Sequence, residues 1–149
     1  MILLPIVKMY TGILPTGYVK SLTRFCEELV PAVLNSEEGP LQPGSVRVMH
    51  MISDTTPDSE VIFDIEAYYF DDRVQNLEIR ANHLKNAFDK ISSNHQIPIF
   101  NNLKCIVWMK LVDAAYSSNE SEPVQEPVLM NINAAIERLY SKCGYVSLE

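Results

Sequence analysis

The period of the hydrophobic pattern changes in the same order twice along this chain, and this repeat restricts the fold more than any other feature. Each round consists of an apolar strand, a helical stripe and a second apolar strand, at 5–10, 16–33 and 46–52, and then at 61–70, 77–91 and 103–111. Alternation with a period of two is typical of a strand, and apolar spacings of three and four indicate a helix that packs by one side. The pattern predicts an α/β fold: a two-layer sandwich with the order β-α-β-β-α-β.

Two polar or helix-breaking residues suggest where the helices end or begin. Pro31 lies inside the first helical stripe and predicts a kink or an end there, because proline lacks the N–H that the helix needs. Asp72 precedes the second stripe and predicts an N-terminal cap for that helix. We therefore expect two helices, each bounded by local chemistry.

The second strand, 46–52, is apolar at nearly every position, which predicts a strand covered on both faces. Arg47 interrupts it, and a buried guanidinium is costly unless it has a partner. We expect Arg47 either to form an ion pair across a subunit interface or to bind a ligand anion. His50 is expected to be a hydrogen-bonded core imidazole.

The third and fourth strands predict one apolar face and one mixed face. In the third strand, 61–70, Asp64 and Glu66 share a face, where they either line a subunit seam or bond to neighbouring strands. In the fourth, 103–111, the second face carries Trp108. A sheet face of this kind is expected to pack against sister subunits.

The C-terminal part predicts an appendage and not a second domain. The fourth strand could continue to Tyr116. Residues 117–127 are polar, acidic and proline-bearing, which indicates a linker, and 128–142 can form one short helix. We expect a main domain at 1–116, followed by the linker and the added C-terminal helix at 117–149.

Charge and hydropathy exclude several classes of partner. Twelve Lys and Arg against 19 Asp and Glu give a net charge of −7, the wrong sign for binding a phosphate backbone, so no nucleic-acid partner is expected. RNA-recognition domains share the predicted element order, but acidic residues surround the aromatic residues of the third strand and their consensus is absent. No apolar run is long enough to span a membrane, and the first five residues lack the features of a secretion signal, so a cytoplasmic protein is expected.

Cysteine and histidine spacing indicates neither disulfides nor metal sites. Cys26, Cys105 and Cys143 are far apart and lie among apolar neighbours, which predicts reduced core residues. The three histidines, His50, His83 and His95, show no spacing that places two imidazoles on one metal. No metal and no cofactor are expected.

The element order, together with a proline that opens the first strand, resembles the tautomerase superfamily and is most similar to its carboxymethyl-hydroxymuconate isomerase branch. The resemblance covers about 5–113 and is carried by four segments: 5–7, 46–50, 62–73 and 103–112. It implies that one subunit contains both β-α-β halves and that subunits assemble as a homotrimer.

The resemblance also implies a chemistry: a proton moves between the enol and keto forms of a small unsaturated keto acid. In this family the base is the amine of an N-terminal proline, which corresponds to Pro5 here. Arg73, just after the third strand, would bind the substrate carboxylate, and Arg47 would supply a second cation. A small anionic keto acid is the implied ligand.

One departure from the family divides the functional hypothesis in two. Met1 to Leu4 precede Pro5, so its nitrogen is a tertiary amide without basicity, unless proteolysis or translation from the Leu4 codon frees it. The first hypothesis is an isomerase that acts once Pro5 is freed. The second is a catalytically inactive tautomerase-fold trimer that acts as a small-anion-binding or structural protein.

Simpler structural roles remain open for two of these residues. Pro5 could merely open its strand, where no ladder hydrogen bond is lost. Arg73 could pair with Asp71 or Asp72 at the surface.

Overall fold

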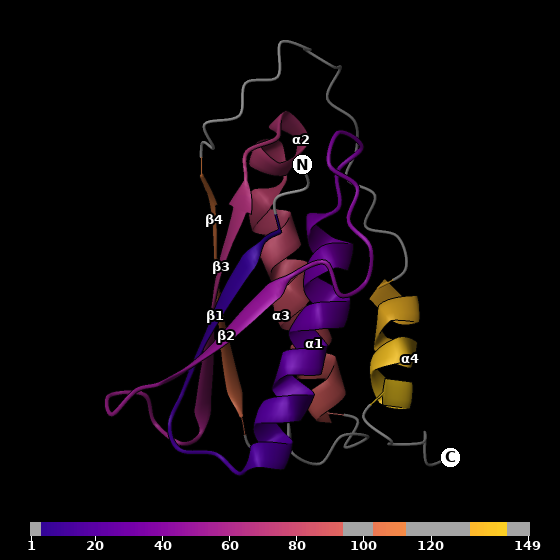
Figure 1. The fold of residues 1–149 in the computed structure, drawn as a ribbon. Helices are drawn as coiled ribbons and strands as arrows, with labels where there is room; N and C mark the ends of the chain where they lie inside the picture. Colours follow the sequence, from indigo (N-terminus) through magenta and orange to yellow (C-terminus); the bar gives the residue numbers. More distant parts are fainter. Residues whose placement is uncertain (1–3, 94–102, 113–131, 143–149) are drawn as a thin grey trace.

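The structure, a computed structural model, describes residues 4–93, 103–112 and 132–142. Its elements are β1 (Ile6–Thr11), α1 (Thr16–Leu34), β2 (Arg47–Ile52), β3 (Glu60–Tyr68), α2 (Asp71–Gln75), α3 (Leu77–Ser93), β4 (Lys104–Val112) and α4 (Ile132–Lys142). The four strands form one sheet, α1 and α3 cover one of its faces, and α4 lies against α1 on the side away from the sheet (Figure 1). The predicted α/β class and its β-α-β-β-α-β order are confirmed.

The sheet is built from two β-α-β units joined at its centre. The strand order is β2-β1-β3-β4, with β1 parallel to β2, β3 parallel to β4, and β1 antiparallel to β3. Each helical crossover therefore connects two adjacent parallel strands. In the split β-α-β arrangement another strand separates the two strands of a unit, so this order differs from that of the RNA-recognition alternative.

Side chains that alternate along the central strands form the core with α1 and α3. Val7 and Met9 on β1 are fully buried, as are Phe63 and Ile65 on β3. The rings of Phe25, Phe63 and Phe88, from α1, β3 and α3, lie with their centroids 5.4 to 6.0 Å apart. The predicted helical stripes are thus the buried sides of their helices.

The second strand is not covered on both faces, and that prediction is wrong for the single chain. β2 is an edge strand, and four of its six residues are exposed, including Arg47, Met49 and Met51. Arg47 is therefore not a buried guanidinium. Of the apolar side chains that suggested a buried strand, Val46 and Val48 pack on the core, whereas Met49 and Met51 lie on the sheet face opposite the helices, which we call the open face.

Pro31 neither ends α1 nor leaves an unpaired carbonyl. The helix continues to Leu34, and the carbonyl of Glu27, four residues before Pro31, accepts a hydrogen bond from the N–H of Gly44 at 2.9 Å. Gly44 has a φ of 84°, a conformation that glycine adopts easily. The loop after α1 thus supplies the donor that proline lacks.

The prediction that Asp72 caps the second helix is also wrong. Helical structure begins one residue earlier, at Asp71, as the short helix α2, and Phe70 is at the N-cap position without a side-chain hydrogen bond. The Asp72 carboxylate instead accepts a hydrogen bond from Ser36 and pairs with Arg80. Asp72 therefore connects α2 to α3 and to the end of α1.

Helix α4 forms part of the predicted 128–142 helix and contributes to the core. Ala135 and Leu139 are fully buried, and α4 packs on α1. The buried Glu28 carboxylate on α1 accepts a hydrogen bond from Arg138 at 2.8 Å and pairs with Lys142. The predicted linker at 117–127, the extension of β4 to Tyr116 and the domain boundary at 116 lie outside the described residues.

Three further expectations concern membrane-spanning helices, cysteine thiols and metal sites. None of the helices in the described ranges is long and apolar enough to span a membrane. Cys26 and Cys105 are free and buried, as predicted, and burial raises the pKa of both thiols. Cys143 and His95 lie outside the described residues. Within those residues, no group of three His, Cys, Asp or Glu side chains could hold a metal ion.

We predict that the contact between α4 and α1 makes stability depend on acid through Glu28. Burial opposes ionisation of Glu28, but the hydrogen bonds and charges of Lys142 and Arg138 outweigh it, so its pKa is lowered. A carboxyl whose pKa falls on folding stabilises the folded state above its unfolded pKa, and this contribution is lost as pH falls through the folded pKa. Urea unfolding of the wild type should therefore show a loss of stability below about pH 5.

The Glu28→Gln variant should lack that part of the pH dependence. At pH 7 it should be about 2 kcal/mol less stable, which is less than for a fully buried pair because Arg138 and Lys142 are about half exposed. Asp89→Asn is the matched control, since Asp89 pairs with Lys85 on the exposed surface of α3. Equal pH profiles for the wild type and Glu28→Gln would contradict the prediction.

Candidate functional site

The strand directions bring the three residues singled out from the sequence to one end of the sheet. β1 and β2 begin at this end and β3 finishes there, since β3 is antiparallel to β1. Pro5 precedes β1, Arg47 begins β2, and Arg73 follows β3 in α2. The N–H of Arg47 donates to the carbonyl of Pro5 at 2.9 Å, so these two backbones are direct neighbours.

The side chains of Pro5 and Arg47, however, belong to opposite faces of the sheet. Pro5 is buried, as are Val7 and Met9, which follow it at intervals of two and face the helices. Arg47 is the register partner of Ile6, and both are exposed on the open face. The structure thus makes Arg47 and Pro5 neighbours in the sheet but places their side chains on different surfaces.

The nitrogen of Pro5 has no proton in this chain. Leu4 precedes it and is 42% exposed, and the peptide bond between the two residues makes the Pro5 nitrogen an amide. The position fits a proline that opens a strand, since its carbonyl still pairs with β2. Whether Pro5 acts as a base depends on the release of its amine.

Arg73 is buried, and its guanidinium is bound to backbone carbonyls. Nε donates to the carbonyl of Leu34 at 2.6 Å, Nη1 to that of Tyr68 at 3.0 Å and Nη2 to that of Gly39 at 3.3 Å. Its Cζ lies 4.7 Å from the centre of the Phe70 ring. Burial, together with the neighbouring charge of Arg80, lowers the pKa of Arg73 to about 10. Arg73 is therefore not a surface partner of Asp71 or Asp72, and its hydrogen bonds connect α2 to the end of α1.

A second buried arginine, Arg80 on α3, was not singled out from the sequence. Its Nη1 donates to the carbonyls of Val33 at 2.8 Å and Asn35 at 2.6 Å, and its Nη2 lies 3.4 Å from the Asp72 carboxylate. Nε has no hydrogen-bond partner among the described residues. Leu77 and Leu84, on either side of Arg80 in the helical stripe, are the signal that could have indicated its burial.

Arg73, Arg80 and Asp72, which we call the arginine cluster, cap the C-terminus of α1. The last carbonyls of a helix have no partner within it and carry partial negative charge, so cations are stabilised there. The two guanidinium groups and the one carboxylate leave an excess of positive charge, and the partial negative charge at the end of α1 compensates part of it. The arrangement explains how α1 ends at Leu34 without a glycine cap.

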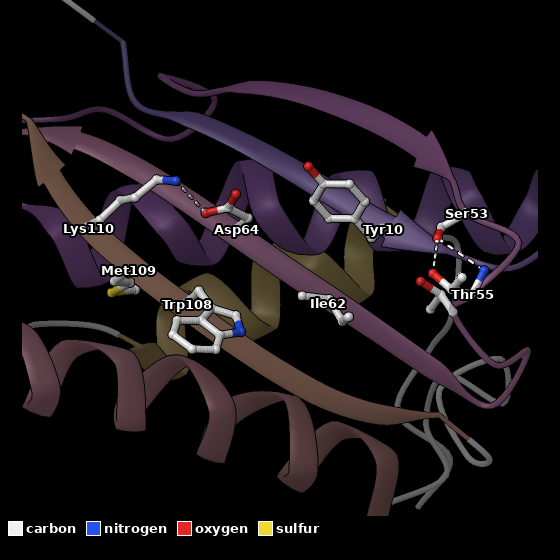
Figure 2. A pocket seen from close by; sticks show the side chains of 9 residues that line it. Tyr10, Ser53, Thr55, Ile62, Asp64, Trp108, Met109 and Lys110 are labelled. Carbon is white, nitrogen blue, oxygen red and sulfur yellow. Dashed lines mark hydrogen bonds and ion pairs between the residues drawn. The ribbon is translucent and has the colours of Figure 1, made fainter.

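A cleft with a volume of about 470 Å³ lies on the open face, away from these residues. It is lined by Tyr10, Ser53, Thr55, Thr56, Ile62, Asp64, Trp108, Met109 and Lys110. Figure 2 shows the rings of Tyr10 and Trp108 on either side of β3, with Ile62 and Asp64 between them. Pro5, Arg47 and Arg73 do not line it.

The charged and polar groups of the cleft are partly paired with one another. Lys110 Nζ lies 3.4 Å from Asp64 and 3.9 Å from Glu66, which bears out the expectation that these carboxylates bond to a neighbouring strand. At the other end, the hydroxyl oxygens of Ser53 and Thr55 are 3.0 Å apart. The cleft therefore combines aromatic walls with a carboxylate at one end and hydroxyls at the other.

His50 lies on β2 and is hydrogen bonded, as predicted. Its Nε2 is 2.6 Å from the hydroxyl oxygen of Thr11, a fully buried residue of β1. This contact fits a structural imidazole between neighbouring strands.

Comparisons with known proteins add little to this description. No protein-family model and no curated protein matches the chain. Among solved structures, it is similar to a crystal structure of 5-carboxymethyl-2-hydroxymuconate delta-isomerase, with 12% sequence identity and a TM-score of 0.39, over 80% of this chain and 89% of that chain. The α/β class follows from the strands and helices of the chain itself.

We predict that the arginine cluster is needed for stability. Arg80→Lys keeps the charge but removes the planar group that reaches two carbonyls and Asp72 together, so the free energy of unfolding should fall by about 2 kcal/mol. Urea unfolding followed by circular dichroism measures this.

Arg24→Lys, on the exposed side of α1, is the matched control and should change stability by less than about 0.5 kcal/mol. If Arg80→Lys were as stable as this control, the capping role of the cluster would be refuted.

Proposed function

We propose that this chain is the subunit of a homotrimer that acts as a small-anion-binding or structural protein. The observation that carries the proposal is the open face of the sheet, which no described helix or loop covers. It bears exposed apolar side chains, and apolar patches on a surface are typical of interaction sites. Copies of the same chain are the proposed cover.

One apolar part of this face lies over β1 and β2. Ile6, Met49 and Met51, which we call the edge patch, are 36 to 41% exposed. β2 and β4 are the two edges of the sheet and have no outer neighbour among the described strands, which favours pairing with another chain. Contacts between unlike edges of successive copies can close into a ring, and three copies is the number implied by the family resemblance.

Arg47 supports the proposal of a small anionic ligand. It is exposed next to the edge patch, and no ion pair to it occurs within the described residues. A guanidinium group binds a carboxylate through two parallel hydrogen bonds. The carboxylate of a small keto acid is the ligand that we propose for Arg47.

We predict that the wild type forms a trimer and that the edge patch is needed for it. Light scattering should give three times the 16.9 kDa of one chain. Met49→Glu should shift the mass towards the monomer, because it places a charge where apolar contact is proposed.

The matched control is Ile79→Glu on α3, since Ile79 is 47% exposed and Met49 is 41% exposed. A monomeric wild type, or equal masses for both variants, would refute the role of the edge patch.

A second candidate function is isomerisation of a small unsaturated keto acid by proton transfer between its enol and keto forms. Pro5 and Arg73 support it, since both are buried at the same end of the sheet. Burial would lower the pKa of a freed proline amine towards neutrality. Pro5 would act as the base, and Arg73 and Arg47 would supply the cations.

We predict that this activity requires a chain that begins at Pro5. Such a chain, released from a fusion by a protease, should convert phenylenolpyruvate to its keto form, measured as a loss of ultraviolet absorbance. The full chain should not, because an acylated proline accepts no proton.

Pro5→Ala in the released chain should lower kcat by at least about 100-fold, the usual contribution of a general base. Turnover by the full chain that survives Pro5→Ala would exclude the proline mechanism, and an inactive released chain would leave the trimer proposal as the better account.

A further inference from the structure

We propose that the outer side of α1 is a docking site for α4 of another copy of this chain, which can occupy it in place of the chain's own α4. The site is on the helix layer, on the opposite side of the molecule from the open face (Figure 1). Exchange of α4 is therefore a second kind of contact between copies, and it does not depend on the proposed trimer.

A buried carboxylate on α1 determines which kind of helix can dock there. The side chain of Glu28 is fully buried beneath α4. Its Oε2 accepts a hydrogen bond from Arg138 Nε at 2.8 Å, and its Oε1 pairs with Lys142. A helix without cations at these positions would cover the carboxylate and leave it unpaired, which is costly. The docking site therefore favours a basic helix.

The apolar side chains of α4 complete the match. Ala135 and Leu139 are fully buried, and they are on the same side of the helix as Arg138 and Lys142, at spacings of three and four residues. Among the described elements, α4 packs chiefly on α1. The groups that hold α4 thus belong mainly to one helix, and α4 of another copy can make the same contacts with it.

The length of the chain before α4 allows it to reach a second copy. β4 ends at Val112 and α4 begins at Ile132, and a segment of this length spans at most about 65 Å. Exchange of an identical element keeps the native contacts and is a low-cost route to association. Every copy carries both α1 and α4, so a second copy is the occupant whose charge complementarity the structure already contains.

Two full-length variants with reversed charges test the exchange. In the first, Arg138→Glu together with Lys142→Glu makes α4 acidic, so that it is repelled by Glu28 of its own chain. In the second, Glu28→Lys makes the docking site basic, so that it repels its own basic α4. When the two variants are refolded together from urea, each supplies a helix of the charge that the other requires.

The melting temperature followed by circular dichroism is the measurement. Each variant alone should melt about 5 °C or more below the wild type, and the equimolar mixture should recover at least about half of this loss. The matched control mixes the first variant with Asp89→Lys, because Asp89 pairs with Lys85 on the exposed surface of α3. This control mixture should melt no higher than its two components.

Two results would overturn the inference. If the mixture melts no higher than its separate components, α4 docks only within its own chain. If the single variants melt at the wild-type temperature, Glu28 does not select the helix. A variant that folds only in the mixture would support the exchange, and Lys142→Glu alone replaces the double substitution if that chain does not fold in either case. The mass of the wild type tests the trimer separately, since the mixing experiment compares melting temperatures and not oligomeric states.

Discussion

The antiparallel pairing of β1 with β3 is the contact on which the rest of this structure depends. It joins two β-α-β units, each of which contributes only two strands and one long helix, into a single sheet with a shared core. The pairing also fixes which side chains face the helices and which face outwards. Val7 and Ile65 are register partners and are both buried, whereas Lys8 and Asp64, one position along, are on the open face. A shift by one residue would exchange these two faces.

The arginine cluster connects the same two halves at the helix layer. Arg73 and Arg80 belong to the second unit, and the carbonyls that they bind at Val33, Leu34 and Asn35 end the helix of the first. Burying two guanidinium groups is costly, and carbonyl acceptors and Asp72 offset this cost. A substrate carboxylate at Arg73 would have to compete with, or add to, hydrogen bonds that already hold the fold together. A loss of activity on mutation of Arg73 therefore has to be separated from a loss of stability.

Hydrophobic periodicity was sufficient to predict the order of the four strands and of the two long helices between them, because each of these elements packs by one regular face. The five-residue helix α2 was not predicted. The errors concern positions where a local pattern has two physical explanations. The apolar residues of β2 fit a strand buried on both faces, but they fit equally an edge strand with an open apolar face, and Met49 and Met51 have the second environment. Pro31 predicts a helix end only if no other donor is present, and the donor Gly44 is 13 residues further along the chain.

The candidate site was less predictable than the fold, since it depends on direction as well as position. Pro5, Arg47 and Arg73 do lie at one end of the sheet, because β1 and β2 begin there and β3 ends there. Alternation along the strands then places the side chains of Arg47 and Pro5 on opposite faces of the sheet. Arg73 is buried, and its guanidinium donates to three backbone carbonyls. Arg80 was missed because a single arginine in an apolar stripe is usually at its border.

The open face shows why net charge alone predicts ligands poorly. A net charge of −7 opposes the binding of a polyanion, but it does not describe a single surface. On this face the carboxylates of Asp64 and Glu66 alternate with cations on the neighbouring strands, and Arg47 stands at the opposite border. Such alternation lets two copies approach without a large repulsion, and it leaves room for local sites of either sign. The same arrangement is therefore compatible with the proposed self-association of the sheet and with the anion proposed for Arg47.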